Sequence, residues 1–360
     1  MHIAVVTASI TSGGAERVIS ELVNQWCEYD DVKCTLILLH VQPLFYNISS
    51  KVEIIEIGKK NSVFYIDKLL KYKKVREIIK SINADVVLSM PEEIGIYVIG
   101  ALLGTGVPVI VSERNNPRVM PYKKITRLLR YLLYPYVDGL IFQSPGAMNF
   151  FSNEIKSKSV ILPNPLNIDK MPAPYLKEKE KVVVSVGRLE KQKNFQLLIE
   201  AYDLFWKNHN EYSLIIYGEG SLRNDLEELA KNKDSGKSIF LPGRDENVLE
   251  KIKNASMFII SSDYEGVPNA LIEAMAMGLN CISTDCEPGG AAMLIDNGKN
   301  GLLVPTGNKI SMAEAMQKMH DLNNNCDNLM SINSIDIRYR FDAKKVALEW
   351  FNYIKKFGLS

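Results

Sequence analysis

Short apolar runs alternate with longer stretches of helical period along almost the whole chain. Strands of a parallel sheet that is covered on both faces form such short apolar runs, and the helices between them supply the cover. The alternation therefore predicts an α/β protein built from doubly wound parallel sheets. In the first half we expect strands at 2–7, 33–39, 52–57, 85–90, 108–112, 138–143 and 158–162.

The alternation stops between residues 163 and 181, where four prolines and a KEKEK run predict an extended connector. A chain of 360 residues exceeds the size of one ordinary hydrophobic core, so two domains are expected. We place them at 1–168 and 169–341, with the amphipathic segment 342–360 packing back onto the first. The second series of strands is expected at 182–186, 212–217, 238–241, 257–261, 280–284 and 301–304.

Residues 94–112 form an uncharged stretch of about the length that crosses a bilayer. Gly104, Gly106 and Pro108 interrupt it, so we expect a buried helix followed by a buried strand. No secretory signal is visible before the first strand, and the five cysteines include no Cys-x-x-Cys pair. These features argue against a disulfide framework and a zinc knuckle, and they predict a cytoplasmic protein.

The net charge is only +1, so bulk electrostatics give no support to nucleic-acid binding. The first 168 residues carry 19 Lys and Arg against 15 Asp and Glu, and the remainder carries 24 against 27. The first half is therefore mildly basic.

Ligands bind doubly wound sheets beyond the carboxyl ends of the strands, so the loops there hold the candidate chemistry. The SGGAER loop brings Gly13 and Gly14 to a helix start, whose free N–H groups favour a phosphate; a plain helix start explains it equally well. The VGRLEKQKN loop delivers Arg188 and Lys193, two cations that suit a diphosphate, directly after an apolar strand. Solvated surface charge is the alternative for this pair.

The segment EGVPNALIE places Glu265 and Glu273 eight positions apart, with Pro268 where a helix begins. A fully helical span would separate the carboxylates by roughly 12 Å. A retaining glycosidase pair needs about 5 to 5.5 Å, so these carboxylates instead suit the two ends of one long ligand. Solvent-facing helix charges are the alternative. The Gly-x-Gly at 218–220 is weaker evidence because it also fits a tight turn.

The chain resembles the retaining glycosyltransferase family four in a series of motifs that occur in the family's order: SGGAER, GRLEKQKN, GEGSLRNDLEEL, LPGR, EGVPNALIEAMAMG and NGLLVP. The resemblance covers nearly the whole chain. It implies the GT-B fold, with two doubly wound Rossmann-like domains facing a central cleft, the first for the acceptor and the second for a nucleotide sugar. Within the family the chain is similar to bacterial enzymes that extend polyprenyl-diphosphate-linked glycans for capsule, O-antigen or N-glycan precursors.

The resemblance also implies roles for individual residues. Arg188 and Lys193 match the pair that binds the donor diphosphate as it departs. Glu265 matches the carboxylate that holds hydroxyls of the transferred sugar, and Glu273 matches the ribose ligand. The positions implied to contact the donor, including its base and phosphates, are Gly13, Gly14, Gly187, Gly218, Gly220, Gly243, Arg244, Gly266, Val267, Pro268, Asn269, Ala270, Leu271 and Glu273.

The chain departs from the family pattern at two places. Arg114 stands where many members have a histidine, so we expect it to meet a phosphate rather than to act as a catalytic residue. Met293 stands where an acidic residue is common, which leaves the contacts of Gly289 and Gly290 open.

The activity implied is that of a retaining hexosyltransferase that needs no cofactor and no metal, since no Asp-x-Asp motif is present. The expected donor is UDP-hexose or UDP-N-acetylhexosamine, and the acceptor a glycan on polyprenyl diphosphate. A non-catalytic partner with the same fold is the alternative, and the presence of Arg188, Lys193, Glu265 and Glu273 favours an enzyme. An oxidoreductase is disfavoured because SGGAER lacks the Gly-x-Gly-x-x-Gly spacing.

The segment PYKKITRLLRYLLYPYVD predicts a basic amphipathic helix with four leucines. Such a helix can lie on an anionic membrane or bind an acceptor's diphosphate, which predicts a peripheral protein on the cytoplasmic face of the inner membrane. A helix with a solvated basic face is the equal alternative. The residues assigned to acceptor or membrane are Arg17, Arg114, Lys123, Lys124, Arg127 and Arg130.

Overall fold

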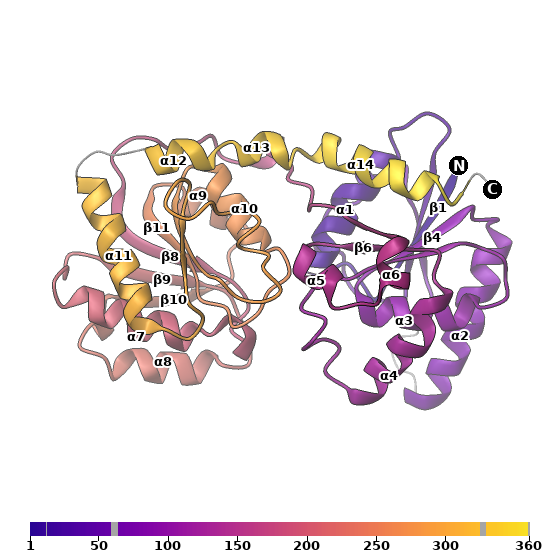
Figure 1. The fold of residues 1–360 in the computed structure, drawn as a ribbon, viewed down its shortest axis with the longest axis horizontal. Coiled ribbons are helices and arrows are strands. Elements are labelled where there is room, and N and C mark those ends of the chain that lie inside the picture. Colours follow the sequence, from indigo (N-terminus) through magenta and orange to yellow (C-terminus); the bar gives the residue numbers. More distant parts are fainter. Residues whose placement is uncertain (12, 59–63, 325–328, 359–360) are drawn as a thin grey trace. The chain divides into compact units, whose positions relative to one another are not determined.

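The structure is a computed structural model that describes residues 1–11, 13–58, 64–324 and 329–358. Ser12 and Cys326 lie outside this part. Internal contacts divide the chain into two units, residues 1–167 with 341–360 and residues 168–340. Each unit is a parallel sheet with helices (Figure 1), and the units begin and end one residue from the boundaries expected from the sequence.

The N-terminal unit contains a seven-stranded parallel sheet in the order β3-β2-β1-β4-β5-β6-β7. All seven strands expected in this half are present, with ends that differ by at most one residue. The strands are β1 (His2–Thr7), β2 (Lys33–Leu38), β3 (Glu53–Glu56), β4 (Val86–Ser89), β5 (Val109–Ser112), β6 (Gly139–Phe142) and β7 (Ser159–Ile161).

Helices cover both faces of this sheet because successive side chains of a buried strand point to opposite sides. Ile3 and Val5 pack with α1 and α14, whereas Ala4 and Val6 pack with α2 and α3. The uncharged stretch that begins at residue 94 lies in α3 and β5, as expected. The helices are α1 (Gly14–Trp26), α2 (Phe64–Ser81), α3 (Glu92–Leu102), α4 (Lys124–Leu133), α5 (Pro145–Asn149), α6 (Asn153–Ser157) and α14 (Ala343–Lys355).

The C-terminal unit repeats this architecture with a six-stranded parallel sheet in the order β10-β9-β8-β11-β12-β13. Its core lies between the sheet and the helices α7, α8 and α11. The strands are β8 (Glu180–Val186), β9 (Ser213–Tyr217), β10 (Ile239–Gly243), β11 (Ala255–Ile260), β12 (Asn280–Thr284) and β13 (Leu302–Val304). The helices are α7 (Phe195–Trp206), α8 (Arg223–Lys231), α9 (Val248–Ile252), α10 (Asn269–Ala276), α11 (Lys309–Asn324), α12 (Leu329–Ser334) and α13 (Ile337–Arg340).

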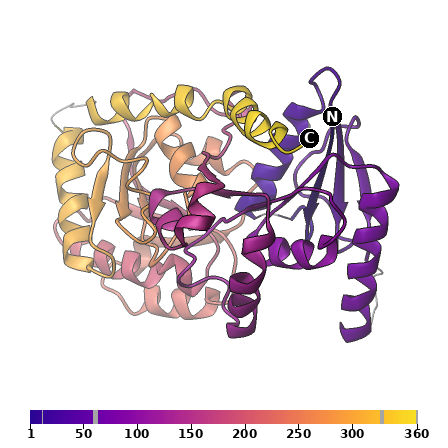
Figure 2. The same cartoon turned by 45° about the vertical axis from the view of Figure 1, so that its right-hand side comes forward.

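Helix α14, from the end of the chain, lies beside α1 in the N-terminal unit (Figures 1 and 2). The indole nitrogen of Trp26 donates a hydrogen bond to the carbonyl of Ala347 at 2.8 Å. Trp350 is fully buried, and its indole nitrogen donates to the carbonyl of Pro163 at 2.9 Å. The last helix therefore completes the core of the first unit.

Within the described residues no helix is long and apolar enough to cross a bilayer. The four cysteines of this part, Cys27, Cys34, Cys281 and Cys286, are free thiols. Burial raises the pKa of Cys34 to about 12, so this thiol stays protonated and unreactive at neutral pH.

Replacing Trp350 by alanine should lower the free energy of unfolding of the N-terminal unit by about 3–5 kcal/mol, because it empties a buried aromatic site. Hydrogen exchange of the β1 and β4 amides measures this change. Leu348→Ala, on the exposed side of the same helix, should alter it by less than about 0.5 kcal/mol. Equal effects of the two substitutions would contradict the packing role of Trp350.

Candidate functional site

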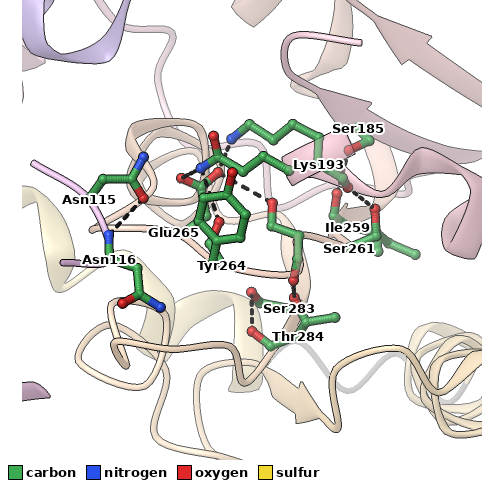
Figure 3. A network of polar contacts seen from close by, with 12 residues as sticks. Asn115, Asn116, Ser185, Lys193, Ile259, Ser261, Tyr264, Glu265, Ser283 and Thr284 are labelled. Atoms are coloured by element: carbon green, nitrogen blue, oxygen red, sulfur yellow. Dashed lines mark hydrogen bonds and ion pairs between the residues drawn. The ribbon is translucent and has the colours of Figure 1, made fainter. Parts of the chain in front are cut away.

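A buried ion pair joins two loops at the carboxyl edge of the C-terminal sheet. The ammonium of Lys193 contacts Oε1 of Glu265, and the two side chains are only 17% and 11% exposed. Gln192 donates to Oε2 of Glu265 at 3.3 Å, and the hydroxyl of Ser262 donates to Oε1 at 3.3 Å. Figure 3 shows the lysine reaching across to the carboxylate. Burial among polar partners fixes both charges in one geometry.

The loop after β8 owes its shape to Asn194. This residue adopts a left-handed backbone conformation at φ 44°, and its side chain caps α7 by accepting from the Leu197 amide at 3.1 Å. Asparagine tolerates this conformation better than most residues. Its side-chain nitrogen also donates to Asp263 at 2.7 Å, and the Asp263 amide donates to the Gln192 carbonyl at 2.9 Å. The cap therefore holds the lysine loop against the glutamate loop.

Hydrogen bonds extend this junction to β12. Ser261 donates to the carbonyl of Lys193 at 2.8 Å, and Thr284 donates to the carbonyl of Ser262 at 2.6 Å (Figure 3). The Glu265 amide donates to the carbonyl of Glu287 at 3.2 Å. Loops from β8, β11 and β12 thus form one unit. Because parallel strands end at the same edge, this is where a doubly wound sheet binds its ligand.

The glycines of this edge let neighbouring backbones touch. A Cβ on Gly218 would lie 1.8 Å from the carbonyl oxygen of Gly187, and one on Gly220 would lie 2.4 Å from that of Leu189. At Gly290 the Cβ would lie 1.6 Å from the carbonyl oxygen of Gly266. Close backbone approach accounts for the Gly-x-Gly at 218–220, which the sequence left as either a tight turn or a ligand loop.

Both glutamates of the Glu-x7-Glu element are buried, so the alternative that they are solvent-facing helix charges is wrong. Glu265 is 8% exposed and Glu273 is 7% exposed. The span is not one helix either, because Pro268 stands at the N-cap and α10 begins at Asn269. The helical separation considered from the sequence therefore does not apply.

The other predicted donor contacts differ in exposure. Arg188 is exposed, and its charge helps to lower the pKa of Glu190, after the larger effect of hydrogen bonds from Ser221. Leu271 is fully buried and Val267 is 7% exposed, so their side chains belong to the core. The other residues of this unit that were predicted to contact the donor are Gly187, Gly243, Arg244, Gly266, Asn269 and Ala270.

In the N-terminal unit, Gly13 forms the N-cap of α1 and Gly14 is its first residue. Burial lowers the pKa of Arg17 in the first turns of this helix. Arg114 follows β5, its backbone amide donates to Glu92 at 3.2 Å, and its Nη2 donates to Asn164 at 2.6 Å. Burial lowers the pKa of Arg114 to about 10. Its predicted contact with a phosphate stays a prediction.

The basic face predicted for residues 123–130 is corrected by the structure. Arg130 is buried, and it donates to the carbonyls of Met120 and Pro117 at 2.8 Å each. Arg127 donates to the carbonyls of Pro121 at 2.7 Å and Val119 at 2.6 Å. Buried carbonyls require donors, so these two arginines hold the loop before α4 rather than a ligand. Lys123 and Lys124 are exposed.

Arg130 also faces a buried acid. Oε1 of Glu113 lies 3.6 Å from Arg130 and accepts a hydrogen bond from Tyr134 at 2.6 Å. Burial raises the pKa of Glu113 to about 8, in spite of the arginine. Burial thus favours the neutral form of this carboxyl.

Sequence reasoning missed the two side chains that hold the Glu265 carboxylate. Gln192 lies in the GRLEKQKN motif beside Lys193, and Ser262 lies three residues before Glu265, but no pattern predicted their contacts with the carboxylate.

The apolar face of α4, which the sequence predicted together with a basic face, is exposed. Its members are Ile125, which is 61% exposed, Leu128 (52%), Leu129 (38%) and Leu132 (51%).

Comparison with known proteins shows which class of protein the chain resembles. Residues 167–333 match the family model for glycosyl transferases group 1. The chain is 29% identical over 98% of both lengths to a Campylobacter jejuni α-1,4-N-acetyl-D-galactosaminyltransferase that acts on a GalNAc-containing diNAcBac-PP-undecaprenol. The folds of sucrose-phosphate synthase from Thermosynechococcus elongatus and of Anabaena HepE in complex with UDP-glucose superpose with TM-scores of 0.84 and 0.80, at 16% and 15% identity, over 99% or more of every chain.

Two Rossmann-like units with such neighbours define a GT-B protein. Residues 167–333 are therefore a group 1 glycosyltransferase domain, and the resemblance seen in the motifs is confirmed.

Alanine at Gly290 should force apart the two backbones that meet beside Glu265, at a cost of about 1–3 kcal/mol. Alanine at the adjacent Gly289, where φ is 85° and no atom lies within 4 Å of the Cβ, should cost about 1 kcal/mol from backbone strain alone. Hydrogen exchange of residues 261–268 should rise in the first variant and stay near wild type in the second. The same exchange in both would contradict the close approach.

Proposed function

We propose that this enzyme transfers a hexose or N-acetylhexosamine from a UDP-sugar to a hydroxyl of a polyprenyl-diphosphate-linked glycan, with retention at the anomeric carbon. The observation that carries the proposal is the buried Lys193–Glu265 pair at the carboxyl edge of the C-terminal sheet, with Arg188 exposed on the same loop. The undecaprenol-linked acceptor in the name of the C. jejuni relative and the UDP-glucose in the HepE complex support this substrate class.

In the proposed mechanism the two cations meet the charge that develops on the departing diphosphate. Preorganised charge of this kind stabilises a transition state without reorganisation during the reaction. Glu265 has two roles: its carboxylate holds the Lys193 ammonium in place, and its oxygens accept hydrogen bonds from hydroxyls of the transferred sugar. Glu273, one turn into α10, is assigned to the ribose, and the region of Gly243 and Arg244 to the base.

Retention follows if the acceptor hydroxyl attacks from the face that the diphosphate leaves and the departing phosphate oxygen takes its proton. No covalent sugar–enzyme intermediate is formed. The carboxylate of Asp263 accepts a hydrogen bond from Asn194, and the carboxylate of Glu265 contacts Lys193. In this proposal Arg188 and Lys193 supply the positive charge that a metal ion would otherwise supply. The proposed enzyme is thus metal-independent.

Turnover of a panel of nucleotide sugars in EDTA tests this proposal, with NMR of the product giving the anomeric configuration. Arg188→Ala/Lys193→Ala should lower kcat by at least about 10²–10³-fold, because the substitutions remove two positive charges that stabilise the departing diphosphate in the transition state. The control Lys191→Ala removes an exposed lysine from the same turn and should retain activity. Undiminished kcat in the double variant contradicts the mechanism, and inactive wild-type protein with every donor favours a non-catalytic partner.

We further propose that α4 lies on an anionic membrane surface on the cytoplasmic side, where a polyprenyl-linked acceptor is found. Four aliphatic side chains of α4 and the rings of Tyr122, Tyr131 and Tyr136 are exposed, the tyrosines by 60%, 79% and 64%. Aromatic and apolar side chains flanked by lysines are typical of interfacial helices. Lys123 and Lys124 supply the charge complementarity for anionic lipid.

Leu128→Ser/Leu132→Ser should reduce sedimentation with vesicles of phosphatidylglycerol and phosphatidylethanolamine by at least 10-fold, since burial of two leucines contributes about 1.5–3 kcal/mol each. Lys123→Ala/Lys124→Ala should weaken binding mainly at low salt. Leu329→Ser changes a leucine of the C-terminal unit that is 65% exposed, more than either leucine of α4, and serves as the control. If all of these variants bound the vesicles equally well, α4 would not be the membrane-binding surface.

A further inference from the structure

A cluster of metal-binding side chains lies at the opposite edge of the C-terminal sheet from the active-site loops. His209 and Glu211 lie in the turn between α7 and β9, and His320 lies on α11. One ligand atom from each residue lies within 4.8 Å of the others. The two imidazole rings have centroids 3.9 Å apart. His209 and His320 are two of the four histidines of the chain.

Hydrogen bonds fix the proton position on each ring. Nε2 of His209 lies 2.6 Å from Oε1 of Gln317, and since an amide oxygen only accepts, Nε2 carries the proton and Nδ1 keeps its lone pair. Nε2 of His320 accepts from the amide nitrogen of Asn324 at 2.8 Å, so its proton is on Nδ1.

That proton points to the hydroxyl of Tyr212 at 3.1 Å. The phenol oxygen accepts this hydrogen bond, since a hydroxyl oxygen carries free lone pairs. Outer partners that hold one ring nitrogen and orient the lone pair of the other are typical of histidine ligands to metals.

We propose that His209, Glu211 and His320 form a binding site for a divalent transition metal, with Zn²⁺ as the best match. Two imidazole nitrogens and one carboxylate oxygen are ligands that Zn²⁺ takes, with water in the remaining position. Asn324 is exposed, so its amide can leave Nε2 of His320 when the metal arrives. The Lys181–Glu211 ion pair at 3.0 Å is solvent-exposed and weak, so the Glu211 carboxylate can exchange it for a metal ion.

The site is structural rather than catalytic. It lies before the amino end of β9, whereas Lys193 and Glu265 lie beyond the carboxyl ends of β8 and β11. A metal here links the α7–β9 turn to α11, elements whose side chains Phe205 and Met316 share one core. The inference is independent of the proposed transfer reaction, so its outcome and that of the activity assay are separate.

Tag-free protein stripped with EDTA and titrated with ZnCl₂ by calorimetry tests the site. One equivalent should bind, Co²⁺ should give d–d absorption bands of a low-coordinate site, and Zn²⁺ should raise Tm, since a ligand of the native state stabilises it. His209→Gln and Glu211→Gln, both outside the buried core, should each weaken binding by at least about 10-fold. His320→Asn should abolish it.

His40→Gln removes an exposed histidine of the other unit and should bind Zn²⁺ as wild type does. Glycosyl transfer by EDTA-treated protein should be unchanged in His209→Gln. Wild-type affinity for Zn²⁺ no greater than that of the His209→Gln/Glu211→Gln protein would overturn the proposal and leave the cluster as stacked imidazoles beside Phe205.

Discussion

The contact between Lys193 and Glu265 governs the organisation of the C-terminal unit, since three loops converge on it. Two opposite charges taken out of water are tolerated only where other polar groups complete their hydrogen bonds. Gln192 and Ser262 do this for the carboxylate, and Asn194 and Thr284 hold the loops that carry them. The result is a rigid, charged edge on an otherwise apolar sheet. This edge therefore holds an ammonium and a carboxylate side by side in a fixed arrangement.

The N-terminal unit uses buried charge differently. Arg130 satisfies the carbonyls of the loop before α4 and faces Glu113, whose pKa is raised by burial. The guanidinium of Arg130 therefore stabilises the fold and is buried rather than exposed at the surface. The same helix turns its leucines outward, so the amphipathic character is inverted relative to an ordinary covering helix. An exposed apolar face that is built in this way indicates contact with something other than water.

Much of the fold was predictable because both sheets are parallel and buried on both faces. Such strands are short apolar runs, and their ends fall where the apolar run ends, as at β1 and β9. The meeting of the charged loops was predictable too, because the carboxyl ends of parallel strands lie at one edge whatever the order of the strands. Thus Arg188, Lys193 and Glu265 could be singled out from their loops alone, and the motif series added the class of chemistry.

The sequence by itself determined the two sheets, the boundary near residue 168 and the loops that carry charge, since each depends on local periodicity and chain order. Only the tertiary structure decided which charged side chains stay exposed to solvent and which form contacts within the protein. Arg127 and Lys124 look alike in the chain, yet one binds backbone carbonyls and the other meets solvent. The meeting of His209 with His320 was likewise invisible, because residues over a hundred positions apart are brought together by packing between helices and not by any pattern along the chain.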